Sequence, residues 1–315
     1  EIEFEHNGIR LFTLDDVVSI TGIGTSTKAD DDTSIGKFGV GFKAVFAYTN
    51  SPEIYSGNFS FRIHDLVVPS QEGMVRPNMD ANKTRFVFPF NHPKKTPEKA
   101  VKEIEHSLLN LGDNTLLFLN HIKKVEFICP FRGFGSLERF DHGNGHIKII
   151  TNHINGEVYS SHWLHFQKDV EVNGEDGKNH VCTIAIAYSL KEVSNKNSPA
   201  TKWKIIPLDH GQVSIFFPAE KETSNLKFHV HAPFASTVAR DSVRDCEENH
   251  QLRDHIAELV AESLESIREK GLLDVSFLAV LPNSTDNLSP FYEPIRKKLI
   301  HAFQTQNLTP TKQGL

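Results

Sequence analysis

The pattern of hydrophobic and polar positions divides the chain into three parts of different character. Residues 1–120 mix strand-like alternation with helix-like periodicity, residues 121–250 contain a series of short alternating runs, and residues 251–315 are helix-periodic. Gly, Asn and Asp separate the middle runs, which favours turns between strands. We therefore predict an α+β protein with a first domain at 1–120, a second domain at 121–250 and a helical C-terminal segment at 251–315.

Two helix starts are marked by local capping signals. Thr13-Leu14-Asp15-Asp16 has the pattern of a capping box, and Thr96-Pro97-Glu98 combines a threonine cap with proline at the first helical position. A third helix is predicted to follow a glycine-rich turn at residues 36–41, and residues 69–83 are expected to form a loop. Strands are predicted at 53–56, 59–65, 84–90, 122–128, 146–151, 157–166, 181–188, 213–217 and 226–231, with a strand, a turn and a second strand within 1–12.

Composition narrows the class of protein without naming an activity. Hydrophobic residues make up 38% and charged residues 23%, which is ordinary for a globular protein, and the net charge is -6. This acidic balance argues against nucleic acid as a partner. The three cysteines lie far apart, and no stretch is apolar enough to span a bilayer. These features favour a reducing, cytoplasmic location and no contact with a membrane.

The sharpest chemical signal is the segment IGKFGVGFK at residues 35–43. Polyphosphate groups are bound by backbone N–H groups that approach closely, and glycine permits this through its missing Cβ and its access to positive φ. A helix that starts at such a loop adds N–H donors. The spacing is neither that of a dinucleotide-binding fingerprint nor that of a Walker A loop. A glycine-rich helix entry packed tightly on a sheet is the structural alternative.

This segment resembles the phosphate loop of the ninety-kilodalton heat-shock chaperone, and still more that of the sacsin-type branch of the GHKL ATPases. Three further segments match in order. Residues 5–8 stand at the family's Asp-x-Gly adenine motif, residues 22–28 at its lid, and residues 83–86 at its Gly-Thr strand. The resemblance covers about 85 residues. It implies a GHKL-type α/β sandwich, the Bergerat-like ATP-binding fold, which is incomplete at its N-terminus here.

The resemblance also implies roles for individual residues. Gly8 would form the turn that admits the base, the glycines of the loop would bind phosphates, Lys28 would reach them from the lid, and Thr84 would bond the adenine side. As alternatives, Lys28 is a solvated loop lysine and Thr84 an ordinary strand threonine. The implied ATP-binding set is His6, Asn7, Gly8, Lys28, Gly36, Lys37, Phe38, Gly39, Val40, Gly41, Phe42 and Thr84.

Three departures from the family pattern limit what the resemblance implies. His6 replaces the aspartate that accepts from the adenine amino group, which puts adenine selectivity in question. Lys83 replaces a glycine. The family's helix with the water-activating glutamate and the Mg²⁺-binding asparagine does not precede Glu1, and Glu3 and Glu5 are not substitutes because they lie on the incoming strand. ATP and Mg²⁺ are the implied cofactors, with no Mg²⁺ ligand found, so hydrolysis is not supported.

The second domain contains a segment that resembles the chaperone's middle domain. In residues 232–241, APFASTVARD, Arg240 matches an arginine that reaches the γ-phosphate, which makes it the implied catalytic residue, with Arg244 as a substitute. The alternative is a surface arginine paired with a neighbouring aspartate. The resemblance implies a βαβ-rich transducer domain. His229 and His231 share a strand face, but without a third ligand we predict no metal site.

These observations favour an ATP-binding, chaperone-like conformational switch within a larger ATPase. The first alternative is a degenerate nucleotide-binding or protein-interaction module without hydrolysis. The second is a DNA-acting GHKL ATPase of the gyrase or mismatch-repair type, which the acidic charge disfavours. The expected partners are a nucleotide and a protein client or neighbouring domains, with a homodimer possible in the full-length protein.

Overall fold

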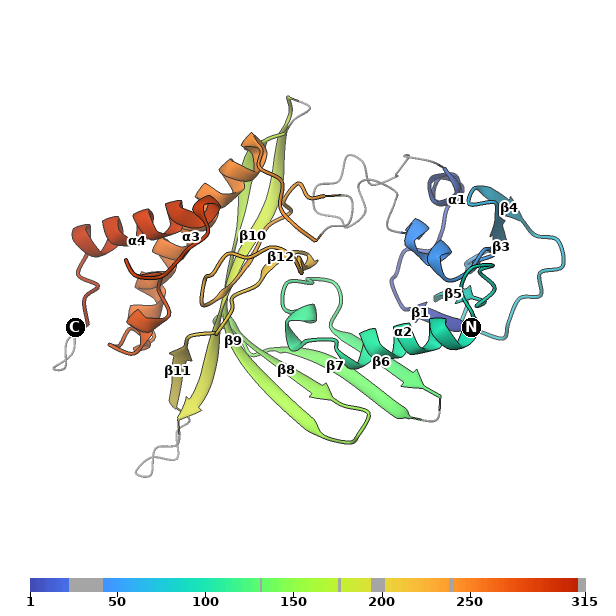
Figure 1. Cartoon of the computed structure of the whole chain (residues 1–315), viewed down its shortest axis with the longest axis horizontal. Helices are drawn as coiled ribbons and strands as arrows, with labels where there is room; N and C mark the ends of the chain where they lie inside the picture. Colours follow the sequence, from blue (N-terminus) through green and yellow to red (C-terminus); the bar gives the residue numbers. More distant parts are fainter. Residues whose placement is uncertain (23–41, 131, 175–176, 194–201, 238–240, 311–315) are drawn as a thin grey trace. The chain divides into compact units, whose positions relative to one another are not determined.

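A computed structural model of the chain describes residues 1–22, 42–130, 132–174, 177–193, 202–237 and 241–310 (Figure 1). The chain divides into two compact units, Glu1–Asn110 and Leu111–Leu315. Both are α+β, and their sheets are antiparallel except for the parallel pair of β12 with β14. Among the described residues, no helix has the length and apolar character needed to cross a membrane.

The first unit is built on a five-stranded sheet with the strand order β1-β5-β2-β3-β4. The first and fifth strands are neighbours, so residues 2–6 and residues 84–88 pair with each other in the sheet. The elements are β1 (Ile2–His6), α1 (Leu14–Thr21), the 3₁₀ helix η1 (Phe42–Ala47), β2 (Glu53–Ser56), β3 (Phe59–His64), β4 (Val68–Ser70), β5 (Thr84–Phe88) and α2 (Pro97–Leu109).

The capping signals of the sequence are confirmed at both helix starts. The Asp16 amide donates to Thr13 Oγ1 at 3.4 Å, and the Thr13 amide donates to Asp16 Oδ2 at 2.9 Å, which completes the capping box of α1. Thr96 caps α2 by accepting from the Lys99 amide at 3.3 Å. These bonds satisfy amide groups that have no partner within the helix.

Three local predictions in the first unit are corrected. The second strand expected within residues 1–12 is absent from that segment, because the Phe12 amide donates to the Ser56 hydroxyl and not to a neighbouring strand. The helix expected after the glycine-rich turn is a 3₁₀ helix. The loop expected at 69–83 begins with part of β4, which pairs with β3.

A small aromatic core lies on one face of this sheet. Val17 of α1 packs with Ile54, Phe61 and Ile63 of β2 and β3. Partly buried residues surround them: Phe12, Ile20, Phe42, Phe46, Phe59 and Phe86. The alternation of β2 and β3 places these side chains on the same side, because successive residues of a strand point to opposite faces.

The second unit is built on a nine-stranded sheet. Its order is β13-β12-β14-β10-β9-β8-β7-β6, with β11 paired to β10. Strands β6 to β10 follow one another as antiparallel neighbours, so the expected βαβ-rich arrangement is wrong for this part of the chain. The strands are β6 (Lys124–Cys129), β7 (Gly133–Asp141), β8 (His146–Asn152), β9 (Val158–Asn173), β10 (Asn179–Val193), β11 (Lys202–Ile206), β12 (Val213–Ile215), β13 (Phe217–Pro218) and β14 (His229–His231).

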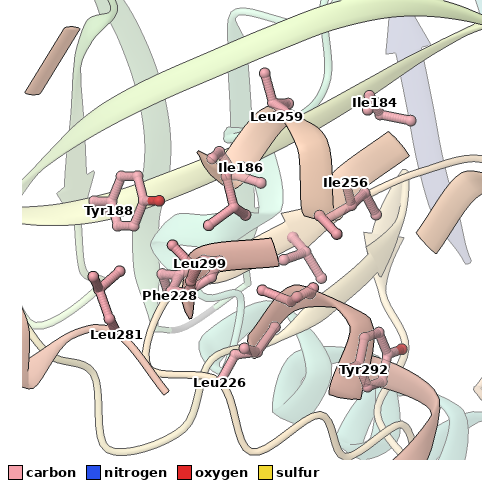
Figure 2. Close-up of a cluster of buried hydrophobic side chains, with 14 of the residues drawn as sticks. Ile184, Ile186, Tyr188, Leu226, Phe228, Ile256, Leu259, Leu281, Tyr292 and Leu299 are labelled. Carbon is pink, nitrogen blue, oxygen red and sulfur yellow. The ribbon is translucent and has the colours of Figure 1, made fainter. Parts of the chain in front are cut away.

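The main core lies between this sheet and two helices, α3 (Glu247–Glu269) and α4 (Glu293–Thr305). Figure 2 shows Ile184, Ile186 and Tyr188 of β10 in one cluster with side chains from α3, from α4 and from the segments that precede these helices. Apolar residues recur along α3 at helical spacing and form one face of the helix, which packs into the core. Its buried residues include Leu252, Ile256, Leu259, Val260, Leu264 and Ile267.

The opposite face of the sheet is covered by residues 111–119. Leu116 and Leu117 are fully buried, and Phe118 packs against His165 and His231. The Arg139 guanidinium donates from Nη1 to the carbonyl oxygens of Leu116, Leu117 and Leu119. Residues 111–120, assigned to the first domain from sequence, therefore belong to the second compact unit, and so does the helical C-terminal segment.

Candidate functional site

The structure describes five of the predicted ATP-binding residues: His6, Asn7, Gly8, Phe42 and Thr84. All five belong to the first unit. The other predicted residues, Lys28, Gly36, Lys37, Phe38, Gly39, Val40, Gly41 and Arg240, lie outside the described residues.

Thr84 is the first residue of β5 and lies opposite His6 in the pairing with β1. On its other side it lies opposite Ser56, the last residue of β2. Paired residues of antiparallel strands point to the same face. His6, Thr84 and Ser56 therefore form a row across three strands at one end of the sheet, on the face that carries the aromatic core.

A buried pair of hydroxyl groups lies in the middle of this row. Ser56 Oγ and Thr84 Oγ1 are 2.6 Å apart, and both residues are 0% exposed. Ser56 Oγ also accepts from the Phe12 amide at 3.0 Å. Ser56 thus links β2, β5 and the segment after β1. The sequence analysis missed Ser56, because a serine at a strand end gives no signal of its own.

His6 is held by the turn that follows it. The Gly8 amide donates to His6 Nδ1 at 3.1 Å. A Cβ atom at position 8 would lie 3.1 Å from Nδ1 and 3.3 Å from the Cε1 of the same ring, so a side chain there would crowd the imidazole. The absence of a side chain at Gly8 thus allows its backbone amide to approach the imidazole of His6. Asn7 is exposed between them.

Phe42 packs into the aromatic core. Its ring centroid lies 6.1 Å from that of Phe86 and 6.3 Å from those of Phe46 and Phe88. The next residue, Lys43, donates from Nζ to the carbonyl oxygens of Ile20 at 2.9 Å and Leu66 at 2.6 Å. These contacts fix the start of η1 against α1, and the side chain of Phe42 serves packing there.

The opposite face of the same sheet is charged. Glu5 accepts from Lys83 Nζ at 2.9 Å and from Arg85 Nη2 at 2.8 Å. The side-chain hydrogen bonds from Lys83 and Arg85 hold the pKa of Glu5 below its usual value. A carboxylate so stabilised is a poor general base. The ammonium group of Lys83 lies on Glu5 and not on the His6 row.

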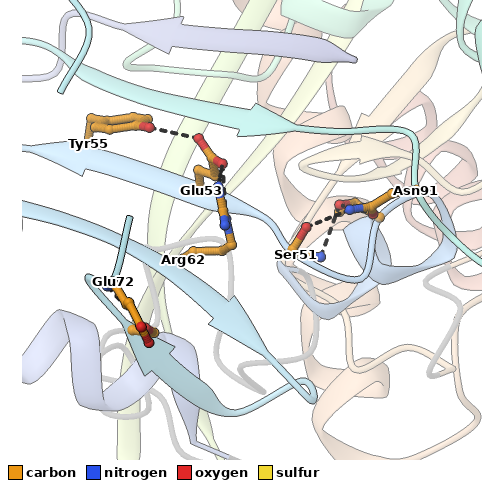
Figure 3. Close-up of polar contacts among 8 residues, drawn as sticks. Ser51, Glu53, Tyr55, Arg62, Glu72 and Asn91 are labelled. Atoms are coloured by element: carbon orange, nitrogen blue, oxygen red, sulfur yellow. Dashed lines mark hydrogen bonds and ion pairs between the residues drawn. The ribbon is translucent and has the colours of Figure 1, made fainter. Parts of the chain in front are cut away.

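A second polar group on this face joins β2 to β3. Arg62 donates from Nε to Glu53 Oε1 at 3.0 Å, and the Tyr55 hydroxyl donates to Glu53 Oε2 at 2.7 Å (Figure 3). Burial and the bond to Glu53 raise the pKa of Tyr55, so its hydroxyl stays protonated. This arrangement satisfies a half-buried carboxylate and locks two neighbouring strands.

Asn91 fastens the turn between η1 and β2. Its Oδ1 accepts from the Thr49 hydroxyl at 3.1 Å and from the Asn50 amide at 2.9 Å, and its Nδ2 donates to Ser51 Oγ at 2.6 Å (Figure 3). Thr49 is fully buried. The side chain of Asn91 thus connects the segment that follows β5 to the residues that precede β2.

In the second unit, the described residues on either side of positions 238–240 are held by buried polar side chains. Asn249 of α3, which is 0% exposed, accepts from the Ala235 amide at 2.8 Å and donates to the carbonyl oxygens of Ala235 at 2.8 Å and Arg244 at 2.7 Å. Glu222 accepts from the Val243 amide at 2.8 Å. The sequence analysis missed Asn249, since an asparagine near a helix start usually serves as a cap.

His229 and His231 lie on the sheet face covered by residues 111–119, as part of its packing. His229 Nδ1 accepts from the Gln212 amide at 2.8 Å, and the ring of His231 stacks on Phe118 with centroids 5.2 Å apart. The described residues contain no group of three or more His, Cys, Asp or Glu side chains placed to hold a metal ion.

Comparison with known proteins gives a consistent picture for the first unit. Residues 7–91 match the family model of the Sacsin domain. Human sacsin is 25% identical over 299 residues, which covers 73% of this chain and 6% of sacsin. Protein NO VEIN of Arabidopsis thaliana is 34% identical over 136 residues, which covers 37% of this chain and 5% of that protein. No solved structure matches the chain.

The chain thus spans about a twentieth of the length of these relatives. The matched segment begins at the turn that holds His6 and ends at Asn91, so it contains Gly8, Ser56 and Thr84. The chain is sacsin-like, and its likeness to the Sacsin domain lies in residues 7–91.

Proposed function

We propose that the chain is a nucleotide-binding, chaperone-like switch module of a larger protein. In this proposal, residues 1–91 form the base-binding and phosphate-binding parts of a GHKL-type site for a purine nucleoside triphosphate, with ATP as the family's ligand. One observation carries the proposal: His6 directly precedes the segment that matches the Sacsin domain, Thr84 lies near the far end of that segment, and the two are directly opposite each other in the sheet.

The phosphate-binding part of the proposal rests on Gly36, Gly39 and Gly41. We expect Gly39→Ala combined with Gly41→Ala to weaken Mg-ATP binding by at least tenfold, because Cβ atoms block close approach of the backbone to phosphate. Calorimetric titration of the full chain with Mg-ATP and with ADP measures this. The control is Gly73→Ala with Gly156→Ala, which adds two Cβ atoms at positive-φ glycines that have open space and are not part of the predicted phosphate loop. Unchanged affinity in the Gly39 and Gly41 variant would refute the phosphate loop.

The switch part of the proposal assigns Arg240 to the γ-phosphate. A guanidinium suits this task, because it stays charged and its fork matches phosphate oxygens. We expect Arg240→Ala to reduce the preference for ATP over ADP while leaving ADP affinity unchanged. An equal loss for both nucleotides would remove Arg240 from this role.

A non-hydrolysing module is the second candidate function, and the state of Glu5 favours it. This carboxylate is held by Lys83 and Arg85 and cannot activate water from that position. Release of phosphate from ATP by the full chain would count against this version. In the non-hydrolysing version, Mg²⁺ would bind together with the nucleotide, and none of the described residues is proposed as its ligand.

Location and partners complete the proposal. None of the three cysteines, Cys129, Cys182 and Cys246, all among the described residues, is joined in a disulfide, which supports a reducing, cytoplasmic environment. Protein clients, neighbouring domains and a homodimer of the full-length protein remain the proposed partners. A switch of this kind would transmit nucleotide state to them.

A further inference from the structure

Strand β6 forms an outer edge of the nine-stranded sheet. Among the described residues, it pairs with β7 alone. The Arg139 amide donates to the carbonyl oxygen of Lys123 at 2.8 Å. Hydrogen-bonded positions alternate along an antiparallel pair, so the amide and carbonyl groups of Lys124, Glu126 and Ile128 point away from β7. An edge of this kind is a template on which another strand can add.

The side chains at these three positions share one face of the sheet, because successive residues of a strand point to opposite faces. Ile128 is 77% exposed, and Lys124 and Glu126 are exposed as well. Lys124 Nζ lies 2.9 Å from Glu126 Oε1, so opposite charges stand two positions apart on this edge. Pro130 has no N–H group and ends the series of donors. The edge therefore presents a cation, an anion and an apolar group in order.

The opposite signs of these charges decide what the edge can accept. Charged side chains usually protect an edge strand from association, because a second copy brings the same charge to the same place. On β6, Lys124 and Glu126 are of opposite sign, so a second copy of the same strand can place each charge beside its opposite.

Symmetry limits the ways in which two copies of β6 can pair. A two-fold axis perpendicular to the sheet makes an antiparallel pair and sets one central residue opposite its own copy. If that residue is Lys124 or Glu126, like charges lie opposite each other, which is destabilising. If it is Phe127, the charge of Glu126 lies opposite the apolar side chain of Ile128. These three registers are therefore disfavoured.

An axis at Val125 gives a complementary register. Lys124 of each copy then lies opposite Glu126 of the other, so that four charges alternate in sign across the junction. Ile122, which is 40% exposed, lies opposite Ile128. We propose that two copies of the chain join edge to edge through β6 in this register. The inference specifies the homodimer within the proposed function, and it does not depend on nucleotide binding.

Sedimentation equilibrium of the full chain, over about a hundredfold range of concentration, tests the pairing. We expect a reversible equilibrium between monomer and dimer. Lys124→Glu and Glu126→Lys each set like charges opposite each other twice, so each should weaken dimerisation by about tenfold. The control is Lys297→Glu, which makes the same change of charge at an exposed position of α4 and should leave the equilibrium unchanged. A chain that stays monomeric at every concentration would overturn the inference.

A mixture of the two charge variants tests the register. When a Lys124→Glu chain pairs with a Glu126→Lys chain, every carboxylate at the junction lies opposite an ammonium group. We therefore expect the mixture to associate about as tightly as the wild-type chain, although each variant alone is mainly monomeric. The unfolding midpoint of each variant shows that it folds. Folded variants that fail to associate when mixed would rule out this pairing of β6.

Calorimetric titration with Mg-ATP separates this inference from the nucleotide part of the proposed function. A chain that binds Mg-ATP and stays monomeric overturns the pairing alone. A chain that dimerises with the expected response to Lys124→Glu supports the pairing, even where it does not bind Mg-ATP.

Discussion

Ser56 and Thr84 share a hydrogen bond in a part of the first unit where both residues are fully buried. A buried hydroxyl without a partner costs free energy, because it has left water and gained nothing in return. The pair is therefore stabilising only while both members are present. At the scale of single residues, this makes the end of the sheet that carries Ser56 and Thr84 sensitive to substitutions that leave its shape almost intact.

We predict strong coupling between Ser56→Ala and Thr84→Val. Each single change should lower the free energy of unfolding by about 1–3 kcal/mol, because it removes the hydrogen bond between the two buried hydroxyl groups. The double variant should cost clearly less than the sum of the two. Urea denaturation of the four proteins measures the coupling, and additive costs would contradict a shared hydrogen bond.

The resemblance to the family's motifs pointed to His6, Gly8 and Thr84 as candidate residues. Ser56 and Asn249 could not be identified in this way. Their importance comes from partners that are distant along the chain, Thr84 for Ser56 and Ala235 for Asn249. No pattern around either residue encodes those pairings.

Elements with local signals were predictable, and elements defined by pairing were not. The caps of α1 and α2 lie within the helices' own sequence, so both starts were found. Strand β7 was missed because glycines and the buried Arg139 interrupt its alternation, and β11 because it is short and contains two lysines. The antiparallel order of the second sheet depends on its long-range pairing, which the strand pattern does not specify.

The loop anchored by Asn249 gives a prediction at the element scale. Asn249→Ala should lower the free energy of unfolding by about 2 kcal/mol, because it removes three hydrogen bonds that a fully buried side chain makes to the backbone of Ala235 and Arg244. It should also speed hydrogen exchange at the Ala235 amide. Ser263→Ala is the control, since Ser263 is buried in the same helix but bonds Val260 and Tyr188. Equal exchange at Ala235 in both variants would argue against anchoring.

At the scale of the whole molecule, buried histidines make the second unit sensitive to acid. Burial lowers the pKa of His165, His229 and His231 to about 4, from an ordinary value near 6.5. Each ring is therefore kept neutral in the folded state. Above pH 6.5 neither state binds these protons, and stability is complete. As the pH falls from 6.5 towards 4, the unfolded state gains protons first and the folded state loses stability.

We predict that the denaturation midpoint of the second unit falls steadily between pH 6.5 and pH 4. Both tryptophans of the chain, Trp163 and Trp203, belong to this unit, so tryptophan fluorescence reports its unfolding selectively. His165→Phe should reduce the dependence on pH, because it removes one of the three groups. A midpoint that does not change with pH over this range would show that the histidines become protonated without cost.

The cover formed by residues 111–119 has a practical consequence for dividing the chain into fragments. A fragment that begins at residue 121 would lack Leu116, Leu117 and Phe118, leaving their side of the sheet bare, and Arg139 would lose three carbonyl partners. We expect that fragment to aggregate on expression, whereas one that begins at residue 111 should remain monodisperse in size-exclusion chromatography. Residues 111–119, which look like a linker in the sequence, are thus an integral part of the second unit.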